Sequence, residues 1–281
     1  MPLVYESRVP IPHGYRQGMR REVVAGTVLI VALCSVVGYA SYRIARQSVF
    51  ARGGRTSPTF ASACPAHSSS AVFRGRPVVT FGDSITEGYG ATSNCVPPDM
   101  QSVVPTASHL VHSRDTSYPG DLARLLHEPV LNYGADDETT SEGLSRLQRV
   151  LGAIQPSSVV LMEGASDLMA GQEPLAVAYR LLRMAAMIRE SGARPILLTV
   201  IPTDGPHWTR LASRIKVLNG LLRAGARSDH VTLADTAAAF AAHKPLAGFF
   251  RQSDGRGDGL HPNDSGYRVL AVLVYQELGH T

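Results

Sequence analysis

Residues 78–90 read Val78-Val79-Thr80-Phe81-Gly82-Asp83-Ser84-Ile85-Thr86-Glu87-Gly88-Tyr89-Gly90, and this stretch decides the fold. Its first four residues are apolar or β-branched, which predicts a buried strand. Gly-Asp-Ser then ends the strand in a turn, and further glycines follow. Open α/β sheets bind ligands at the carboxyl ends of their strands. The stretch therefore predicts that one hydroxyl, that of Ser84, is presented at a ligand-binding edge.

From Pro77 onward, the sequence alternates strand and helix patterns. The strand candidates are residues 78–81, 130–133, 158–162, 195–201 and 230–234. Helical windows lie between them: Leu144, Leu147 and Leu151 share one face, after a capping box formed by Thr139 and Glu142. Alternating βα units predict an α/β fold, with a parallel sheet of about five strands and helices on both faces. A single domain over residues 76–281 is long enough to form its own core.

The far end of the chain supplies partners for the hydroxyl, in Asp258-Gly259-Leu260-His261-Pro262. Acyl transfer by a serine needs an imidazole to take its proton and a carboxylate to orient that imidazole. We expect Asp258 and His261 on a turn before a helix, where their spacing lets both side chains point the same way. Taken singly, Ser84 could be a helix N-cap and His261 a surface residue. No Gly-x-Ser-x-Gly motif occurs, which argues against the α/β-hydrolase fold.

Gly82-Asp83-Ser84 together with Asp258-x-x-His261 resembles the GDSL, or SGNH, hydrolase family of esterases and lipases. The resemblance implies a three-layer, flavodoxin-like domain that hydrolyses a carboxylic ester through an acyl-enzyme on Ser84. His261 would act as general base and then acid, and Asp258 would orient it. No metal or organic cofactor is implied. Two alternatives stay open: an O-acyl or O-acetyl transferase acting on an envelope polymer or lipid, and a non-catalytic envelope binding protein.

The resemblance also implies an oxyanion hole with three donors: the nucleophile's N–H, a glycine N–H and an asparagine side chain. Ser84 supplies the first donor, and we assign the second to Gly134. The third block reads Gly164-Ala165-Ser166-Asp167, so Ser166 stands where the family pattern has asparagine. A serine hydroxyl donates one hydrogen bond over a shorter reach than an amide. Loss of one oxyanion donor costs about 10²–10³ in turnover, so we expect slower or altered catalysis.

The N-terminal part differs in charge and composition. Residues 1–76 carry ten Arg and two Glu, whereas the remainder carries 17 basic and 21 acidic residues. The acidic balance of the domain argues against nucleic-acid binding. Residues 23–42 are uncharged and apolar, and at ~1.5 Å per residue they are long enough to cross a bilayer. We predict a short tail at 1–22, a transmembrane helix at 23–42 and a flexible linker at 43–75.

A cleavable secretory signal is the alternative to this single-pass anchor. The short tail and long C-terminal part favour a catalytic domain outside the cytoplasm. The expected partners are therefore a membrane and a small-molecule, lipid or acylated-carbohydrate ester. In an oxidising compartment Cys64 and Cys95 could pair, although two free thiols are an equal alternative. Cys34 lies inside the apolar run.

Four further side chains invite interpretation. His109 and His112 lie in a long insertion, residues 91–117, and are expected at the surface, because two histidines without further ligands are weak evidence for a metal. The insertion shapes substrate access or is a solvated loop. Trp208 lines the substrate pocket or packs at a helix start. Glu163 is expected to face water at a strand end.

Overall fold

The computed structural model describes residues 75–93, 109–111, 114–253 and 256–279. The predicted tail, transmembrane helix and most of the linker lie outside these residues, as do His112 and the cysteines Cys34, Cys64 and Cys95. None of the helices in the described part of the chain combines the length and the hydropathy that a membrane span requires.

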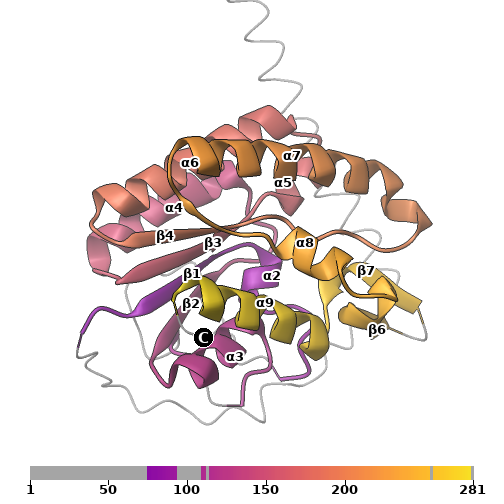
Figure 1. The fold of residues 1–281 in the computed structure, drawn as a ribbon, viewed down its shortest axis with the longest axis horizontal. Coiled ribbons are helices and arrows are strands. Elements are labelled where there is room, and N and C mark those ends of the chain that lie inside the picture. Colours follow the sequence, from indigo (N-terminus) through magenta and orange to yellow (C-terminus); the bar gives the residue numbers. More distant parts are fainter. Residues whose placement is uncertain (1–74, 94–108, 112–113, 254–255, 280–281) are drawn as a thin grey trace, which may run out of the picture. The chain divides into compact units, whose positions relative to one another are not determined.

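The centre of the domain is a five-stranded parallel sheet (Figure 1). Its strands are β1 (Val78–Gly82), β2 (Val130–Gly134), β3 (Ser158–Met162), β4 (Arg194–Leu198) and β5 (Thr232–Ala234). Their spatial order is β2-β1-β3-β4-β5, which is the flavodoxin-like order. All residues of β1, β2 and β3 are buried, as apolar runs between two helical layers should be. The predicted fold class is confirmed, and β4 is shorter than predicted because it ends at Leu198.

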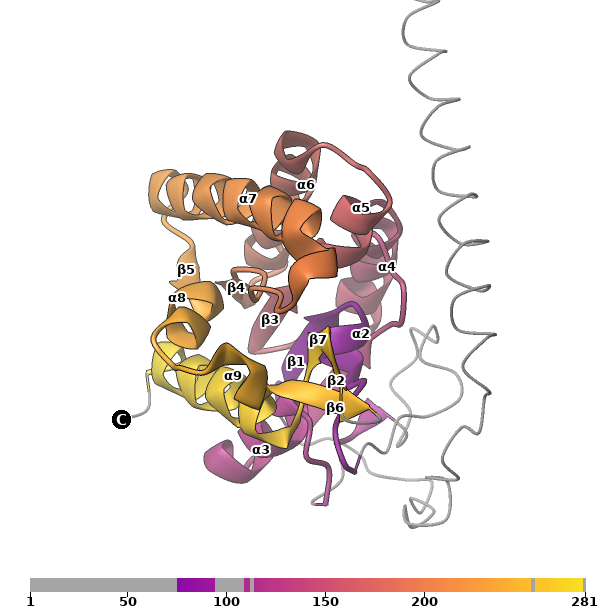
Figure 2. The same cartoon turned by 90° about the vertical axis from the view of Figure 1, so that its right-hand side faces the viewer.

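Helices cover both faces of the sheet (Figures 1 and 2). One apolar core joins the sheet to α4 (Thr140–Ala153), α6 (Pro174–Glu190) and α7 (Thr209–Ser228). The other core joins it to α3 (Tyr118–Leu126), α8 (Thr236–Ala241) and α9 (Asp264–Glu277). Two short helices, α2 (Ser84–Glu87) and α5 (Ala165–Met169), follow β1 and β3 directly. The three predicted layers are therefore present, and the predicted capping box at Thr139 and Glu142 begins α4.

A small hairpin lies outside the main sheet. It consists of the antiparallel strands β6 (Phe250–Ser253) and β7 (Arg256–Pro262), with the 3₁₀ turn η4 (Leu246–Phe249) before it. Asp258 and His261 lie within the bounds of β7, but the predicted turn is present there as a bulge: Asp258 Oδ1 accepts from the N–H groups of Leu260 and His261, and Gly259 has a φ of 65°. β7 pairs with β6 on both sides of this bulge, at Arg256 and Gly257 and again at Pro262, and α9 follows its N-cap, Asn263. β7 contacts α2, so residues 256–262 lie beside the turn that follows β1 (Figure 2).

Candidate active site

Ser84 is held at the carboxyl end of β1 by a tight strand-to-helix turn. It is the first residue of α2, and the N-cap Asp83 accepts a hydrogen bond from the N–H of Ile85 at 3.1 Å. A Cβ on Gly82 would lie 2.0 Å from the carbonyl oxygen of Met162. Glycine is therefore required for β1 to pass this close to β3 on its way into the turn. The turn places Ser84 where the order of the strands reverses.

The structure brings the three predicted side chains together. The distance from Ser84 Oγ to His261 Nε2 is 3.2 Å, across 177 positions of sequence. His261 Nδ1 lies 2.9 Å from Asp258 Oδ2. Because a carboxylate only accepts, Nδ1 carries the proton, and Nε2 is left to accept from the Ser84 hydroxyl. This is the geometry of a nucleophile, a base and an orienting acid.

The orienting carboxylate is itself fixed and charged. Asp258 Oδ1 accepts backbone hydrogen bonds from Leu260 and His261, each at 2.9 Å. Burial acts to raise the pKa of Asp258, but the hydrogen bond and charge of His261 and these two N–H groups hold it below the ordinary value. Asp258 is thus an ionised acceptor at neutral pH, as the orienting role needs. The Tyr89 ring lies 4.5 Å from the imidazole and flanks it.

Gly134 lies directly beneath α2. Its N–H donates to Asn132 Oδ1 at 2.9 Å, and Asn132 Nδ2 donates to the carbonyl of Glu87 at 3.2 Å. A Cβ on Gly134 would lie 2.0 Å from the backbone nitrogen of Glu87, so the close approach of α2 accounts for the glycine. Its role as an oxyanion donor stays a prediction, and it requires the bond to Asn132 to be shared or exchanged with substrate.

Ser166 lies in the first turn of α5 and is 2% exposed. The next residue fixes this turn in place: Asp167 accepts from both the N–H and the hydroxyl of Thr140 at 2.7 Å, and from Arg180 at 3.0 Å. These bonds join α5 to the start of α4 and to α6. Ser166 therefore lies, at the end of β3, on an element that is hydrogen-bonded to α4 and α6, although its role as a donor stays a prediction.

Two expectations about buried residues are wrong. Glu163 does not face water: it is 1% exposed and lies under α4, where a Cβ on Gly143 would be 2.4 Å from its Oε1. Burial raises its pKa well above the ordinary value, the nearby Glu138 carboxylate adds to this, and Arg146 opposes it. His109 is also buried, at 1% exposed, and stacks on Tyr133 with ring centroids 4.2 Å apart. Among the described residues, no group of three or more His, Cys, Asp or Glu is placed to hold a metal ion.

Sequence reasoning missed two contacts at this site. Tyr89 flanks the imidazole, and its carbonyl accepts from the Tyr267 hydroxyl at 2.7 Å, which links the loop after α2 to α9. Trp208 Nε1 donates to the backbone carbonyl of Asp258 at 2.6 Å. Tyr89 follows the Gly-Asp-Ser turn, and Trp208 is the N-cap of α7, so Trp208 does lie at a helix start, but no local sequence pattern indicates that either residue contacts His261 or Asp258.

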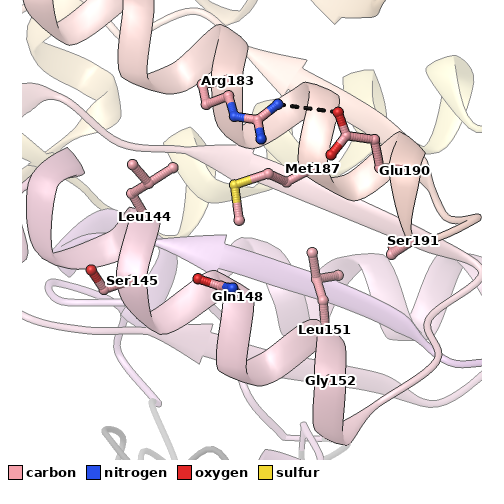
Figure 3. Close-up of a pocket in the computed structure, with 9 residues that line it drawn as sticks. All are labelled: Leu144, Ser145, Gln148, Leu151, Gly152, Arg183, Met187, Glu190 and Ser191. Atoms are coloured by element: carbon pink, nitrogen blue, oxygen red, sulfur yellow. Dashed lines mark hydrogen bonds and ion pairs between the residues drawn. The ribbon is translucent and has the colours of Figure 1, made fainter.

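An open groove of about 540 Å³ lies between α4 and α6, away from the triad (Figure 3). Leu144, Leu151 and Met187 form its apolar part, and the ion pair of Arg183 with Glu190, at 3.1 Å, lies along its rim. None of the triad residues lines it, so it is separate from the chemistry described above.

Comparisons with known proteins agree with this geometry. Residues 80–269 match the model of the GDSL-like Lipase/Acylhydrolase family. The chain is 27% identical over 123 residues to an arylesterase of Vibrio mimicus, covering 44% of this chain and 54% of the relative. It is 32% identical over 88 residues to the esterase TesA of Pseudomonas aeruginosa, covering 31% and 44%. The chain thus spans about half the length of these curated relatives.

A solved structure is similar over most of its length. The lipase/acylhydrolase from Enterococcus faecalis superposes with a TM-score of 0.56 at 27% identity. The match covers 73% of this chain and 95% of that one. The arrangement of the sheet and its helices is therefore one that occurs in a solved acylhydrolase.

Proposed function

We propose that this chain, which belongs to the GDSL-like lipase/acylhydrolase family, hydrolyses carboxylic esters through an acyl-enzyme on Ser84. The observation that carries the proposal is the continuous contact from Ser84 Oγ through the His261 ring to Asp258. The names of the relatives, an arylesterase and an esterase, support an ester as the substrate class.

The proposed reaction proceeds in two halves. Ser84 Oγ attacks the carbonyl carbon of the ester while His261 Nε2 takes the hydroxyl proton. The tetrahedral intermediate then collapses, the C–O bond to the alcohol breaks, and His261 returns the proton to the leaving oxygen. Water attacks the acyl-enzyme by the same path, with its proton taken by His261 and then given back to Ser84. The free acid leaves, and Asp258 holds the imidazole throughout.

The developing negative charge on the carbonyl oxygen is stabilised by N–H and O–H donors. We assign these to the N–H of Ser84, the N–H of Gly134 and the hydroxyl of Ser166. The position of Ser84 at the start of α2 and of Ser166 at the start of α5 supports this assignment, because both elements begin at the same sheet edge.

The test compares Ser84→Ala, His261→Ala and the control Ser141→Ala, which changes an exposed serine on α4. Hydrolysis of p-nitrophenyl esters from acetyl to palmitoyl is followed, and Ser84 is labelled with a fluorophosphonate probe. We expect both site variants to lose at least about 10³ in turnover, since removing a triad member typically costs this much or more. Ser84→Ala with the turnover and labelling of the parent would contradict the proposal. A new ester formed with added alcohol would show acyl transfer instead.

We also propose that residues 23–42 anchor the chain in a membrane, with the hydrolase domain outside the cytoplasm. Their uncharged, apolar composition supports this. Carbonate extraction of membranes should leave the full chain in the pellet, and protease added to intact cells stripped of their outer layers should degrade residues 76–281. Release of the chain by carbonate would contradict the anchor.

A further inference from the structure

The loop between β4 and α7 lies against the part of β7 that carries the catalytic acid. Trp208 Nε1 donates to the carbonyl of Asp258 at 2.6 Å, and the N–H of Asp204 donates to the carbonyl of Gly259 at 2.8 Å. Two successive carbonyls of β7 are therefore held by one loop that lies about fifty positions earlier in the chain. These bonds tie the hairpin to the main domain.

The loop between β4 and α7 approaches Gly259 so closely that no side chain fits at this position. This residue has a φ of 65°, in the left-handed region, and a Cβ on it would lie 1.8 Å from the carbonyl oxygen of Asp204. The same Cβ would lie 3.2 Å from Cδ1 of Trp208. Trp208 is half-buried and packs against the core on the α4–α6–α7 side of the sheet, so its indole is anchored. The backbone of Asp258 and Gly259 therefore lies in close contact with Asp204 and Trp208.

We infer that Trp208 is a positioning residue, whose indole N–H fixes the backbone of Asp258 so that its carboxylate stays aligned with His261 Nδ1. The carboxylate already accepts from the N–H groups of Leu260 and His261, so its orientation is coupled to the path of this same backbone. A change in that path moves the carboxylate and the imidazole together. This inference rests on the proposed function of the triad.

The main variant is Trp208→Phe, made in the full chain. Phenylalanine keeps an aromatic ring for packing but removes the only donor of the indole. Because small misplacements of catalytic groups are costly, we expect kcat to fall about tenfold or more, with KM unchanged and with the same factor for short and long acyl chains. The acid limb of the pH profile of kcat/KM should move to lower pH, because a loosened Asp258 stabilises the imidazolium less.

Tyr179→Phe is the matched control, since it removes a hydroxyl group, with its hydrogen-bond donor, from an aromatic side chain that is 72% exposed. It should leave kcat, KM and the pH profile unchanged. Asp258→Asn separates the two proposals. If Asp258→Asn keeps the activity of the parent, the orienting role of Asp258 fails and the inference about Trp208 fails with it, whereas hydrolysis through Ser84 is tested separately by Ser84→Ala. If Asp258→Asn is inactive while Trp208→Phe matches the parent, only the inference about Trp208 fails. A rise in KM confined to large esters would also overturn it and make Trp208 a substrate contact.

If Trp208→Phe does not fold, a second variant tests the same inference. Gly259→Ala retains the indole but forces the Asp204 loop away from β7. Trp208 is the only tryptophan of the chain, so its fluorescence reports this displacement directly. We expect a red-shifted emission together with a fall in kcat of about tenfold or more. A red shift with the kcat of the parent would overturn the inference.

Discussion

Ser166 is the residue at which the proposed site departs from the asparagine expected there. It is nearly fully buried in the first turn of α5, on an element that Asp167 fixes to α4. We predict that Ser166→Asn raises kcat about tenfold, because an amide reaches further toward the oxyanion than a hydroxyl does. Steady-state hydrolysis of one short-chain ester, measured for the variant and the parent, gives the two kcat values to compare. Ser166→Ala serves as the control and should fall below the parent. A folded Ser166→Asn enzyme no faster than the parent would count against the assignment.

At Gly134 the constraint is steric, because the position has no space for a side chain. A Cβ at this position would lie 2.0 Å from the backbone nitrogen of Glu87 and would push α2 off β2. We predict that Gly134→Ala lowers the free energy of unfolding by about 1–3 kcal/mol, the usual cost of overpacking, and lowers turnover with it. Gly152→Ala on α4 is the matched control, because its Cβ would meet nothing within 4 Å. Urea unfolding should show the control equal to or above the parent; equal losses in both variants would refute the packing argument.

The site residues that the sequence predicts are those whose side-chain chemistry and motif both indicate a reaction. Ser84, Asp258 and His261 stand in short motifs, and their types alone suggest acyl transfer. The burial of Glu163 could not be predicted in this way, because Glu163 follows β3 and its burial depends on the missing side chain of Gly143, which lies on α4. The contact of Trp208 with Asp258 likewise depends on how two distant loops meet.

Among the elements, α5 carries Ser166, the third oxyanion donor that we propose. Asp167 is fully buried and holds α5 to Thr140 and Arg180. We predict that Asp167→Asn lowers the free energy of unfolding by about 1–3 kcal/mol, because the amide nitrogen of asparagine cannot accept the hydrogen bonds that Thr140 and Arg180 donate to the carboxylate. The control Arg183→Gln breaks an exposed pair with Glu190 and should cost under about 1 kcal/mol. Urea titrations of the two variants test the contrast, which a similar loss in both would contradict.

Elements were predictable where apolar patterning was strong. The strands of the main sheet are short apolar runs, and α4, α6 and α7 show helical spacing of large apolar residues. The hairpin of β6 and β7 was missed because Arg256-Gly257-Asp258-Gly259 has neither the apolar alternation nor the β-branched residues of a strand. It forms by pairing with β6 and by contact with the β4–α7 loop, which are features of tertiary structure.

For the molecule as a whole, several carboxyl groups are buried in the fold. Burial raises the pKa of Asp83 to about 7 and that of Asp115 to about 6. Hydrogen bonds from Ile85 to Asp83 and from Ser117 to Asp115 oppose this by lowering the two pKa values. The pKa of Glu163 is raised as well, again by burial first. In each case the folded state holds a proton that the unfolded chain releases at lower pH. Each group therefore lowers the free energy of unfolding as pH rises from its unfolded pKa to its folded one.

Asp83 allows this pH dependence to be tested by a nearly isosteric change. Asp83→Asn keeps a side-chain oxygen to cap α2 at Ile85 but cannot ionise. The variant should match the parent near pH 4 and become progressively more stable than the parent up to pH 7, by an amount on the order of 4 kcal/mol for a shift of this size. Urea unfolding at several pH values measures the difference.

Asp235→Asn gives a control of opposite sign. The hydrogen bond from Arg223 holds the pKa of Asp235 below its ordinary value, against some desolvation, so its ionised form stabilises the fold. Asp235→Asn should therefore lose stability relative to the parent as pH rises through about 4, and the loss should be constant above that. If the difference between Asp83→Asn and the parent were also constant from pH 4 to 7, the Asp83 carboxyl would not be the proton-binding group inferred from its burial. The pH dependence of the fold would then have to arise from the other carboxyl groups whose pKa burial raises, Asp115, Glu163 and Asp167, and Asp115→Asn and Glu163→Gln would test the first two.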